Sequence, residues 1–299
     1  MKRAEYDSFS RCHPAVGCVF FLGAILFGAV IMHPVYIAAS VVCAMIYYCL
    51  LKGLKGLRTV AMLLPVMIVI ACINPLLNHD GAHVLFRVFG RPYTREALLY
   101  GAALAGMLLT MLLWMGCYNE VMTSDKFITL FGKAIPTISL LLLMVLRLVP
   151  NLLRKMRQLA GARKCIGRGA GENSTKKQQA MDGMNVLSAL ISWALEGGVV
   201  TADSMKSRGY GTGERSRFQI FRMTARDIAL IVLLGVLAAG VIVMIARNGT
   251  AAEYTPAVDF APVRGEHAAG FAAYCVFLIL PAALHVKEAI QWHISRSKI

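Results

Sequence analysis

An arginine followed by a glycine at the end of a predicted helix is the feature of this sequence with the clearest chemical use. Ser207, Arg208 and Gly209 close a stretch in which apolar residues recur at helical spacing. An arginine in the last turn projects beyond the helix, and the glycine lets the backbone turn away without a side-chain clash. The guanidinium can then form several hydrogen bonds to carboxylates or carbonyls of a partner. Arg208 is therefore a candidate docking residue; the alternative is that it only complements the negative end of its own helix.

A second arginine lies between glycines at the end of an earlier predicted helix, in the triplet Gly167-Arg168-Gly169. The same chemistry applies to Arg168, because Gly169 would let the backbone turn away behind it. Two such endings on two amphipathic helices favour docking more than one isolated Arg-Gly pair does.

Two long amphipathic helices are predicted to carry these endings. The first is expected over residues 137–162, with Pro136 in its first turn and a kink at Pro150, after a short helix over 126–133. The second is expected over 179–207, because apolar residues there recur at spacings of three and four. Its stripe consists of Leu187, Leu190, Ile191 and Ala194.

The composition indicates a polytopic membrane protein. Of the 299 residues 58% are hydrophobic and only 16% are charged, too little charge for the surface of a soluble protein of this length. Six apolar runs are each near the roughly 20 residues needed to cross a bilayer. Nothing alternates at period two, so the predicted fold is all-α. The predicted spans are residues 16–32, 35–51, 59–77, 97–117, 228–246 and 268–286.

The distribution of basic residues predicts the orientation. Seventeen of the 31 Lys and Arg lie between Lys126 and Arg226, and six spans place 26 of the 31 on one side and five on the other. The positive-inside bias makes that side cytoplasmic, with both termini, in a cell inner (plasma) membrane. The runs 137–150 and 186–200 would give eight spans, but Arg147 and Glu196 interrupt them. We interpret both runs as helices at or beneath the cytoplasmic face.

This topology divides the chain into three parts. Residues 1–117 form an N-terminal membrane domain of four helices, 118–226 a cytoplasmic coupling domain, and 227–299 a C-terminal pair of membrane helices. The coupling domain contains the 17 basic residues between Lys126 and Arg226. The function of the chain therefore depends on which partner this domain binds.

Motifs for catalysis, metals or nucleotides are not supported. The eight cysteines lack paired metal spacing, and His79 and His83, four residues apart, are interpreted as part of a solvated loop. The glycine-rich stretch 167–175 has no Lys-Ser/Thr after its last glycine, so it fails the phosphate-binding pattern. We therefore expect no catalytic residue, no cofactor, no metal site and no nucleic-acid partner.

The same apolar runs bear on other classes of function. No Asp, Glu or Lys falls within the six runs, which disfavours a self-contained secondary transporter. A membrane-embedded enzyme would need clustered carboxylates or histidines. The main alternative is such an enzyme or a scaffold whose basic surface binds anionic lipid. A third possibility is an ordinary ABC permease, which would need a binding path through its own helices.

The predicted coupling domain, residues 118–226, resembles the transmembrane T component of energy-coupling factor (ECF) transporters, a family that includes the cobalt-transport permeases. In that family two cytoplasmic coupling helices each end in an X-Arg-Gly motif. Ser207, Arg208 and Gly209 match the second motif in full. The resemblance is specific over residues 123–217 and rests on Arg147, Pro150, Arg154, Ala162, Cys165, Gly167, Leu187, Ser192, Trp193, Ala194, Leu195, Glu196, Thr201, Ala202, Asp203, Ser204, Met205, Lys206, Tyr210 and Gly211.

The first motif departs from the family pattern. Aligned on Ala162, the triplet falls on Cys165, Ile166 and Gly167, with isoleucine where the family has arginine. The other register, Gly167-Arg168-Gly169, restores an arginine but moves it two residues, about 200° around a helix. Both registers stay open at this point.

The resemblance implies a subunit that does no chemistry of its own. Two cytoplasmic ATP-binding subunits would sit on the coupling helices, and the membrane part would hold a small substrate-binding membrane subunit. ATP-driven movement would pass through the helices to that subunit during vitamin or metal-ion uptake. The unequal motifs make two different ATP-binding subunits a reasonable hypothesis.

Overall fold

A computed structural model describes residues 8–78, 83–88, 91–131, 136–167, 175–212, 223–254, 259–261 and 265–296. Over these residues the chain is α-helical apart from two short hairpins, which confirms the predicted class of a helical, polytopic membrane protein. The chain divides into two compact units, residues 1–127 with 221–299, and residues 128–220. The domain boundaries expected from sequence, after residues 117 and 226, stay a prediction.

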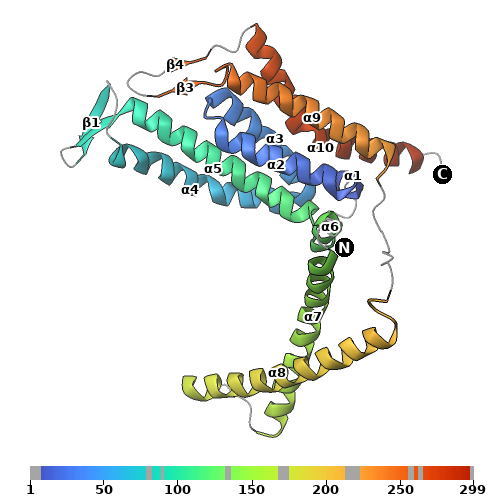
Figure 1. Cartoon of the computed structure of the whole chain (residues 1–299). Coiled ribbons are helices and arrows are strands. Elements are labelled where there is room, and N and C mark those ends of the chain that lie inside the picture. The colour runs from blue at the N-terminus through green and yellow to red at the C-terminus, as the bar shows by residue number, and fades with distance from the viewer. Residues whose placement is uncertain are drawn as a thin grey trace. The chain divides into compact units, whose positions relative to one another are not determined.

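The first unit is a helical bundle in which the N- and C-terminal parts of the chain pack together (Figure 1). Contacts between segments far apart in the sequence join α10 to α1 and to α3, and α9 to α2. Several helices begin where the sequence signals a start: His13 and His33 precede a proline at the first helical position, and the Thr94 hydroxyl accepts the Ala97 N–H. The helices are α1 (Ser8–Arg11), α2 (Pro14–Val30), α3 (Pro34–Lys52), α4 (Leu54–Leu77), α5 (Arg95–Val121), α9 (Ala225–Ala246) and α10 (Glu266–Arg296).

Two short hairpins lie between the predicted spans. β1 (Val84–Val88) pairs antiparallel with β2 (Arg91–Thr94), and β3 (Ala252–Glu253) pairs with β4 (Asp259–Phe260). The alternation that reveals a strand needs several residues, and these strands are two to five residues long. They leave the helical class unchanged.

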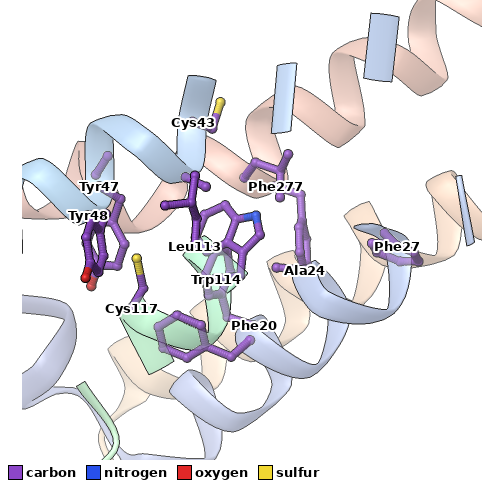
Figure 2. Packing of buried hydrophobic residues seen from close by; sticks show 14 of the residues in the cluster. Phe20, Ala24, Phe27, Cys43, Tyr47, Tyr48, Leu113, Trp114, Cys117 and Phe277 are labelled. Carbon is purple, nitrogen blue, oxygen red and sulfur yellow. The ribbon is translucent and has the colours of Figure 1, made fainter. Parts of the chain in front are cut away.

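Aromatic rings form the centre of the first unit (Figure 2). Trp114 of α5 is fully buried, with its ring centroid 5.3 Å from that of Phe20 on α2. Phe20 in turn stacks on Phe277 of α10 at 5.3 Å. The indole N–H of Trp114 donates to the Ser40 hydroxyl at 3.1 Å, so the buried donor is satisfied. Three segments distant in sequence thereby share one core.

Six described helices are long and apolar enough to cross a membrane. Five of them, α3, α4, α5, α9 and residues 267–287 of α10, coincide with predicted spans. The sixth is α8 (Lys176–Ser207), which is predicted from sequence to lie at the cytoplasmic face. The helix on the first predicted span, α2, has 17 residues and is therefore shorter than these six. At 1.5 Å per residue α2 is about 26 Å long, near the thickness of the hydrocarbon layer. The cytoplasmic placement of α8 stays a prediction.

The close approach of α4 and α5 depends on Gly101. A Cβ at this position would lie 2.6 Å from the Ala71 carbonyl oxygen and 2.7 Å from the Asn74 Cβ. We expect Gly101→Val to force the helices apart and to lower the free energy of unfolding by about 1–3 kcal/mol. Ala102→Val, at the exposed neighbouring position, is the control and should stay within about 0.5 kcal/mol of wild type. Thermal unfolding in detergent measures both; equal losses would contradict the packing argument.

The second unit contains the two predicted amphipathic helices. They are α7 (Pro136–Cys165) and α8, which cross and pack on each other (Figure 1). Pro136 begins α7 as expected, and the helix continues through Pro150 without interruption. The short preceding helix is α6 (Ser124–Phe131). Both long helices therefore extend slightly beyond the ranges predicted from the apolar periodicity.

Candidate functional site

The end of α8 is closed by a glycine in the left-handed conformation. Arg208 is the C-cap residue, with φ −82° and ψ 9°, and Gly209 follows with φ +75°. The Tyr210 N–H donates to the Met205 carbonyl and the Gly209 N–H to the Lys206 carbonyl, both at 3.0 Å. This pair of hydrogen bonds is the Schellman pattern, which satisfies the last carbonyls of a helix. Only glycine adopts the required φ without strain, so the local structure explains why Gly209 follows Arg208.

The described end of α7 shares the glycine conformation and two backbone hydrogen bonds of this cap. Gly167 has φ +69°, and its N–H donates to the Lys164 carbonyl at 3.0 Å. The Ile166 N–H donates to the Ala162 carbonyl at 3.3 Å, as the Arg208 N–H does to Ser204 at 3.2 Å. Cys165-Ile166-Gly167 therefore has the same backbone arrangement as Ser207-Arg208-Gly209. Of the two registers left open by the sequence, only this one lies within the described residues, so the choice between them stays a prediction.

The two cap side chains are both presented to solvent. Ile166 is 69% exposed, and Arg208 is exposed as well. Within the described part of the chain, the Arg208 guanidinium forms neither an ion pair nor a hydrogen bond. Arg168 and Gly169, the residues of the other register, lie outside the described residues. Arg208 is thus exposed at the helix end, a position that also suits the dipole of α8.

Two polar contacts hold α7 against α8. Arg163 Nη2 donates to Asp182 Oδ1 at 2.7 Å, and Lys155 Nζ lies 5.4 Å from the centre of the Trp193 ring. A groove of about 470 Å³ lies between the helices, lined by both partners of the ion pair and by apolar side chains that include Met156, Val186 and Leu190. Among the described residues of α8 only Leu190 is buried. The two polar contacts are therefore a large part of what holds α8 against α7.

We expect the Arg163–Asp182 pair to contribute measurably to the α7–α8 crossing. Both side chains are about a quarter exposed, so the coupling free energy should be about 1 kcal/mol rather than the several kcal/mol of a buried pair. A double-mutant cycle of Arg163→Ala and Asp182→Ala, read by hydrogen exchange of the amides of α7 and α8, measures it. Additive effects of the two substitutions would show that the contact does not hold the helices.

Comparison with known proteins identifies the family. A sequence model of the cobalt transport protein family (CbiQ) matches residues 7–220. The chain belongs to the cobalt transport protein family. The CbiQ match covers α1 to α8 and includes both helix ends, whereas α9 and α10 follow it. No curated protein sequence matches the chain. The predicted resemblance is therefore confirmed, and the chain is a component of a transport system from a family of membrane proteins, not from a family of enzymes.

Two long-range polar contacts inside the first unit, close to where the chain leaves it and returns to it, were not predicted from sequence. Lys126 of α6 is buried, and its Nζ donates to the Ser10 hydroxyl and to the Val121 carbonyl, both at 2.7 Å. Asp227, at the start of α9, accepts the His13 N–H at 3.2 Å. The chain thus leaves and re-enters the first unit beside residues 10–13 in each case. The contacts of Lys126 with Ser10 and of Asp227 with His13 join residues more than 100 positions apart, so no local pattern reveals them.

One local signal at the return into the first unit was overlooked. Thr224 and Asp227 form a reciprocal capping box, in which each side chain accepts the backbone N–H of the other. A threonine three residues before an acidic residue at the start of an apolar run is a recognisable helix start. This pattern would have predicted that α9 begins at Ala225, three residues before the predicted span.

Of the two histidines spaced four residues apart, His79 and His83, the structure describes only His83. His79 lies outside the described residues, while His83 Nδ1 is 2.7 Å from Oε1 of Glu96, in the first turn of α5. Glu96 also accepts the His83 backbone N–H at 3.3 Å. A buried carboxylate at a helix N-terminus, paired with an exposed histidine, ties the β1–β2 hairpin segment to α5. Among the described residues no group of three His, Cys, Asp or Glu side chains gathers as a metal site would need.

Proposed function

We propose that this chain is the coupling subunit of an ATP-driven importer of the ECF type, in which α7 and α8 each dock on a cytoplasmic ATP-binding subunit. The first unit would hold a small substrate-binding membrane subunit. The imported substrate would be a metal ion such as cobalt or a vitamin. The chain itself would bind neither ATP nor substrate, in keeping with its membership of a transport family.

The observation that carries this proposal is the pair of matched helix ends. Two long helices of one compact unit end in the same glycine-closed turn, and each presents its cap side chain to solvent. A helix end with an exposed, unengaged guanidinium suits bidentate contacts with carboxylates or carbonyls. An arginine that served only its own helix dipole would not require a second, equally built end on the neighbouring helix.

The mechanism needs only rigid helices and a partner with two states. The crossing contacts of Arg163 with Asp182 and of Lys155 with Trp193 would make α7 and α8 move together. If the ATP-bound pair of subunits fits one arrangement of the helix ends better than the other, ATP binding shifts the population toward it. The movement would reach the membrane bundle through the segments held by Lys126 and Asp227.

The membrane topology of the proposal follows the basic residues. The termini and the second unit would lie in the cytoplasm, because 26 of the 31 Lys and Arg fall on that side. The apolar stripe of α8 would then lie against the membrane surface or a partner instead of spanning the bilayer. The anionic lipids of the cytoplasmic leaflet attract basic residues as well, so lipid binding and docking of the ATP-binding subunits are compatible.

Purification of the affinity-tagged chain from the membranes that contain it tests the proposal. We expect polypeptides with phosphate-binding motifs and a small hydrophobic membrane protein to copurify in mild detergent. Uptake of radioactive Co²⁺ by cells with and without the chain then tests the metal-ion substrate. Copurification without Co²⁺ uptake would point to a vitamin, whereas the absence of any ATP-binding polypeptide would refute the coupling role.

A further inference from the structure

Charge of a single sign distinguishes α7 from the helix that it crosses. Between Pro136 and Cys165 the sequence of α7 contains six Lys or Arg and no Asp or Glu, whereas α8 contains three residues of each sign. The cations of α8 can therefore be balanced within that helix. The anions that balance α7 have to come from Asp182 of α8, from dissolved ions or from a partner.

Two of the six cations of α7 face α8. Arg163 Nη2 lies 2.7 Å from Asp182 Oδ1, and Lys155 Nζ lies 5.4 Å from the centre of the Trp193 ring. The other four are exposed and, among the described residues, form neither an ion pair nor a hydrogen bond. At 100° per residue they fall within an arc of about 100° around the helix. These four residues, the basic face of α7, are Arg147, Arg154, Arg157 and Lys164.

Exposed leucines lie on the same side of α7, mostly closer to its N-terminal end. Leu143, Leu146 and Leu153 are 50%, 37% and 46% exposed, and with the basic face they fall within about 120° of the helix circumference. This side therefore changes along the helix from leucine to arginine. Dissolved anions would neutralise the cations but leave the leucines in water. The surface of a membrane leaflet offers acyl chains to the leucines and phosphates to the cations.

The cations of the basic face suit phosphate. Three of the four are arginines, whose planar guanidinium donates two parallel hydrogen bonds to a phosphate group. Their long stems can lie along apolar surface while the charged ends reach the phosphates. Each Lys or Arg near an anionic membrane surface raises the affinity by a factor of about five. Several such residues on one side of a helix therefore give a strong preference for anionic lipid.

We propose that the basic face of α7 binds the phosphates of anionic phospholipids in the cytoplasmic leaflet, with Leu143 and Leu146 against the acyl chains. This face lies along the side of α7, apart from the helix end that is proposed to dock on an ATP-binding subunit, so lipid and subunit would bind at the same time. Lipid would hold the body of α7 at the membrane surface. The inference rests on the proposed cytoplasmic placement of the second unit and is independent of docking.

Two probe lipids test the proposal on the intact chain. Native mass spectrometry of the purified full-length chain in mild detergent counts the bound molecules of short-chain phosphatidylglycerol or phosphatidylcholine. The two lipids have the same acyl chains and differ in the charge of the headgroup. We expect the chain to bind phosphatidylglycerol at least about tenfold more tightly. Equal affinities for the two lipids would overturn the inference.

A matched pair of double substitutions locates the site. Arg154→Gln/Arg157→Gln removes two cations of the basic face, and Lys176→Gln/Lys177→Gln removes two exposed cations of α8; glutamine keeps a good helix propensity in both chains. The α7 pair should weaken the binding of phosphatidylglycerol roughly 25-fold, two factors of about five, and leave phosphatidylcholine unchanged. The α8 pair should stay within about twofold of wild type. Equal losses for the two pairs would show unspecific attraction and overturn the inference.

Copurification of the ATP-binding subunits is measured on the same chains. The α7 pair should keep these subunits. If it loses them while its preference for phosphatidylglycerol stays intact, an acidic protein surface covers the basic face and the inference is wrong. Absence of ATP-binding subunits from the wild-type chain would refute the coupling function alone, because lipid binding does not depend on them.

The position of the leucines is measured with a nitroxide label. Cys72→Ser/Cys165→Ser removes the two cysteines that are exposed in the described part of the chain. On this background the label is attached at Leu146→Cys or, near the end of the helix, at Ala162→Cys. In vesicles that contain phosphatidylglycerol, dissolved oxygen should relax the label at position 146 more strongly, and a water-soluble nickel chelate the label at position 162. A label at position 146 that is as open to the chelate as the label at position 162 would overturn the contact with acyl chains.

Discussion

Arg208→Glu is expected to remove an ATP-binding subunit from the purified complex and to abolish ATP-driven uptake. The substitution replaces the exposed cap guanidinium of α8 with a carboxylate that a groove of acceptor oxygens repels. Truncation of one partner of a buried, hydrogen-bonded charge pair costs about 2–5 kcal/mol, and reversal of the charge should cost at least as much. The affinity should therefore fall by a factor on the order of 100 or more. Quantitative copurification from mild detergent measures the loss.

Two further substitutions show whether geometry and position matter. Arg208→Lys keeps the charge but loses the planar fork of donors, so we expect an intermediate loss of roughly tenfold. Arg157→Glu reverses an exposed charge on α7 away from the cap. If the basic residues only attract anionic lipid, Arg157→Glu and Arg208→Glu should lower the amount of anionic lipid that copurifies with the chain alike and leave copurification of the ATP-binding subunits unchanged. That pattern would favour the lipid-binding alternative over docking.

Gly209→Val is expected to weaken docking without touching the docking side chain. At φ +75° an L-residue costs about 1–2 kcal/mol, and a Cβ would lie 3.2 Å from the Thr212 hydroxyl oxygen. Relief of this strain opens the Schellman turn, so Arg208 loses its fixed direction beyond the helix. We expect the yield of the copurified ATP-binding subunit to fall several-fold, up to roughly tenfold. Copurification and uptake assays on the same membranes measure the effect.

The series at Gly209 has internal controls. Asparagine tolerates the left-handed conformation better than other L-residues, so Gly209→Asn should be milder than Gly209→Val. Gly183 lies inside α8 with open space around it, and Gly183→Ala should be neutral or stabilise the helix. Equal losses for Gly209→Asn and Gly209→Val would show that the left-handed turn is not what positions Arg208.

Much of the second unit could be predicted from local sequence. The apolar stripe around Leu187 and Leu190 placed α8 to within three residues, and the glycines after Ser207 marked its end. Pro136 at the first helical position did the same for the start of α7. These signals are local: helical periodicity, a preset φ and a residue that tolerates positive φ all act within one or two turns.

The register at the first helix end could not be predicted in this way. Gly167 and Gly169 are both able to close a helix, so the sequence allowed either triplet. The positive φ at Gly167 and its hydrogen bond to Lys164 give Cys165-Ile166-Gly167 a cap like that of the second motif, and the residues of the other register lie outside those the structure describes, so the choice stays a prediction. Backbone closure depends on where the last helical carbonyls find donors, which composition does not encode.

Long-range contacts were also beyond the reach of sequence patterns. Lys126 was expected only as the start of a short helix, yet its ammonium is buried against Ser10. The two hairpins are too short for their alternation to be recognised. These features depend on packing between segments distant along the chain, whereas the membrane class and the helix faces depend on composition and period alone.

A charge-reversal rescue tests the central claim most directly. The Arg208→Glu chain is combined with an ATP-binding subunit in which a carboxylate residue of the groove that receives the end of α8 is replaced by arginine, and ATP-dependent uptake is measured. The account predicts that each single reversal is inactive and that the pair restores uptake at least about tenfold, a coupling of roughly 1.4 kcal/mol. A pair no more active than either single variant would show that Arg208 does not bind that groove.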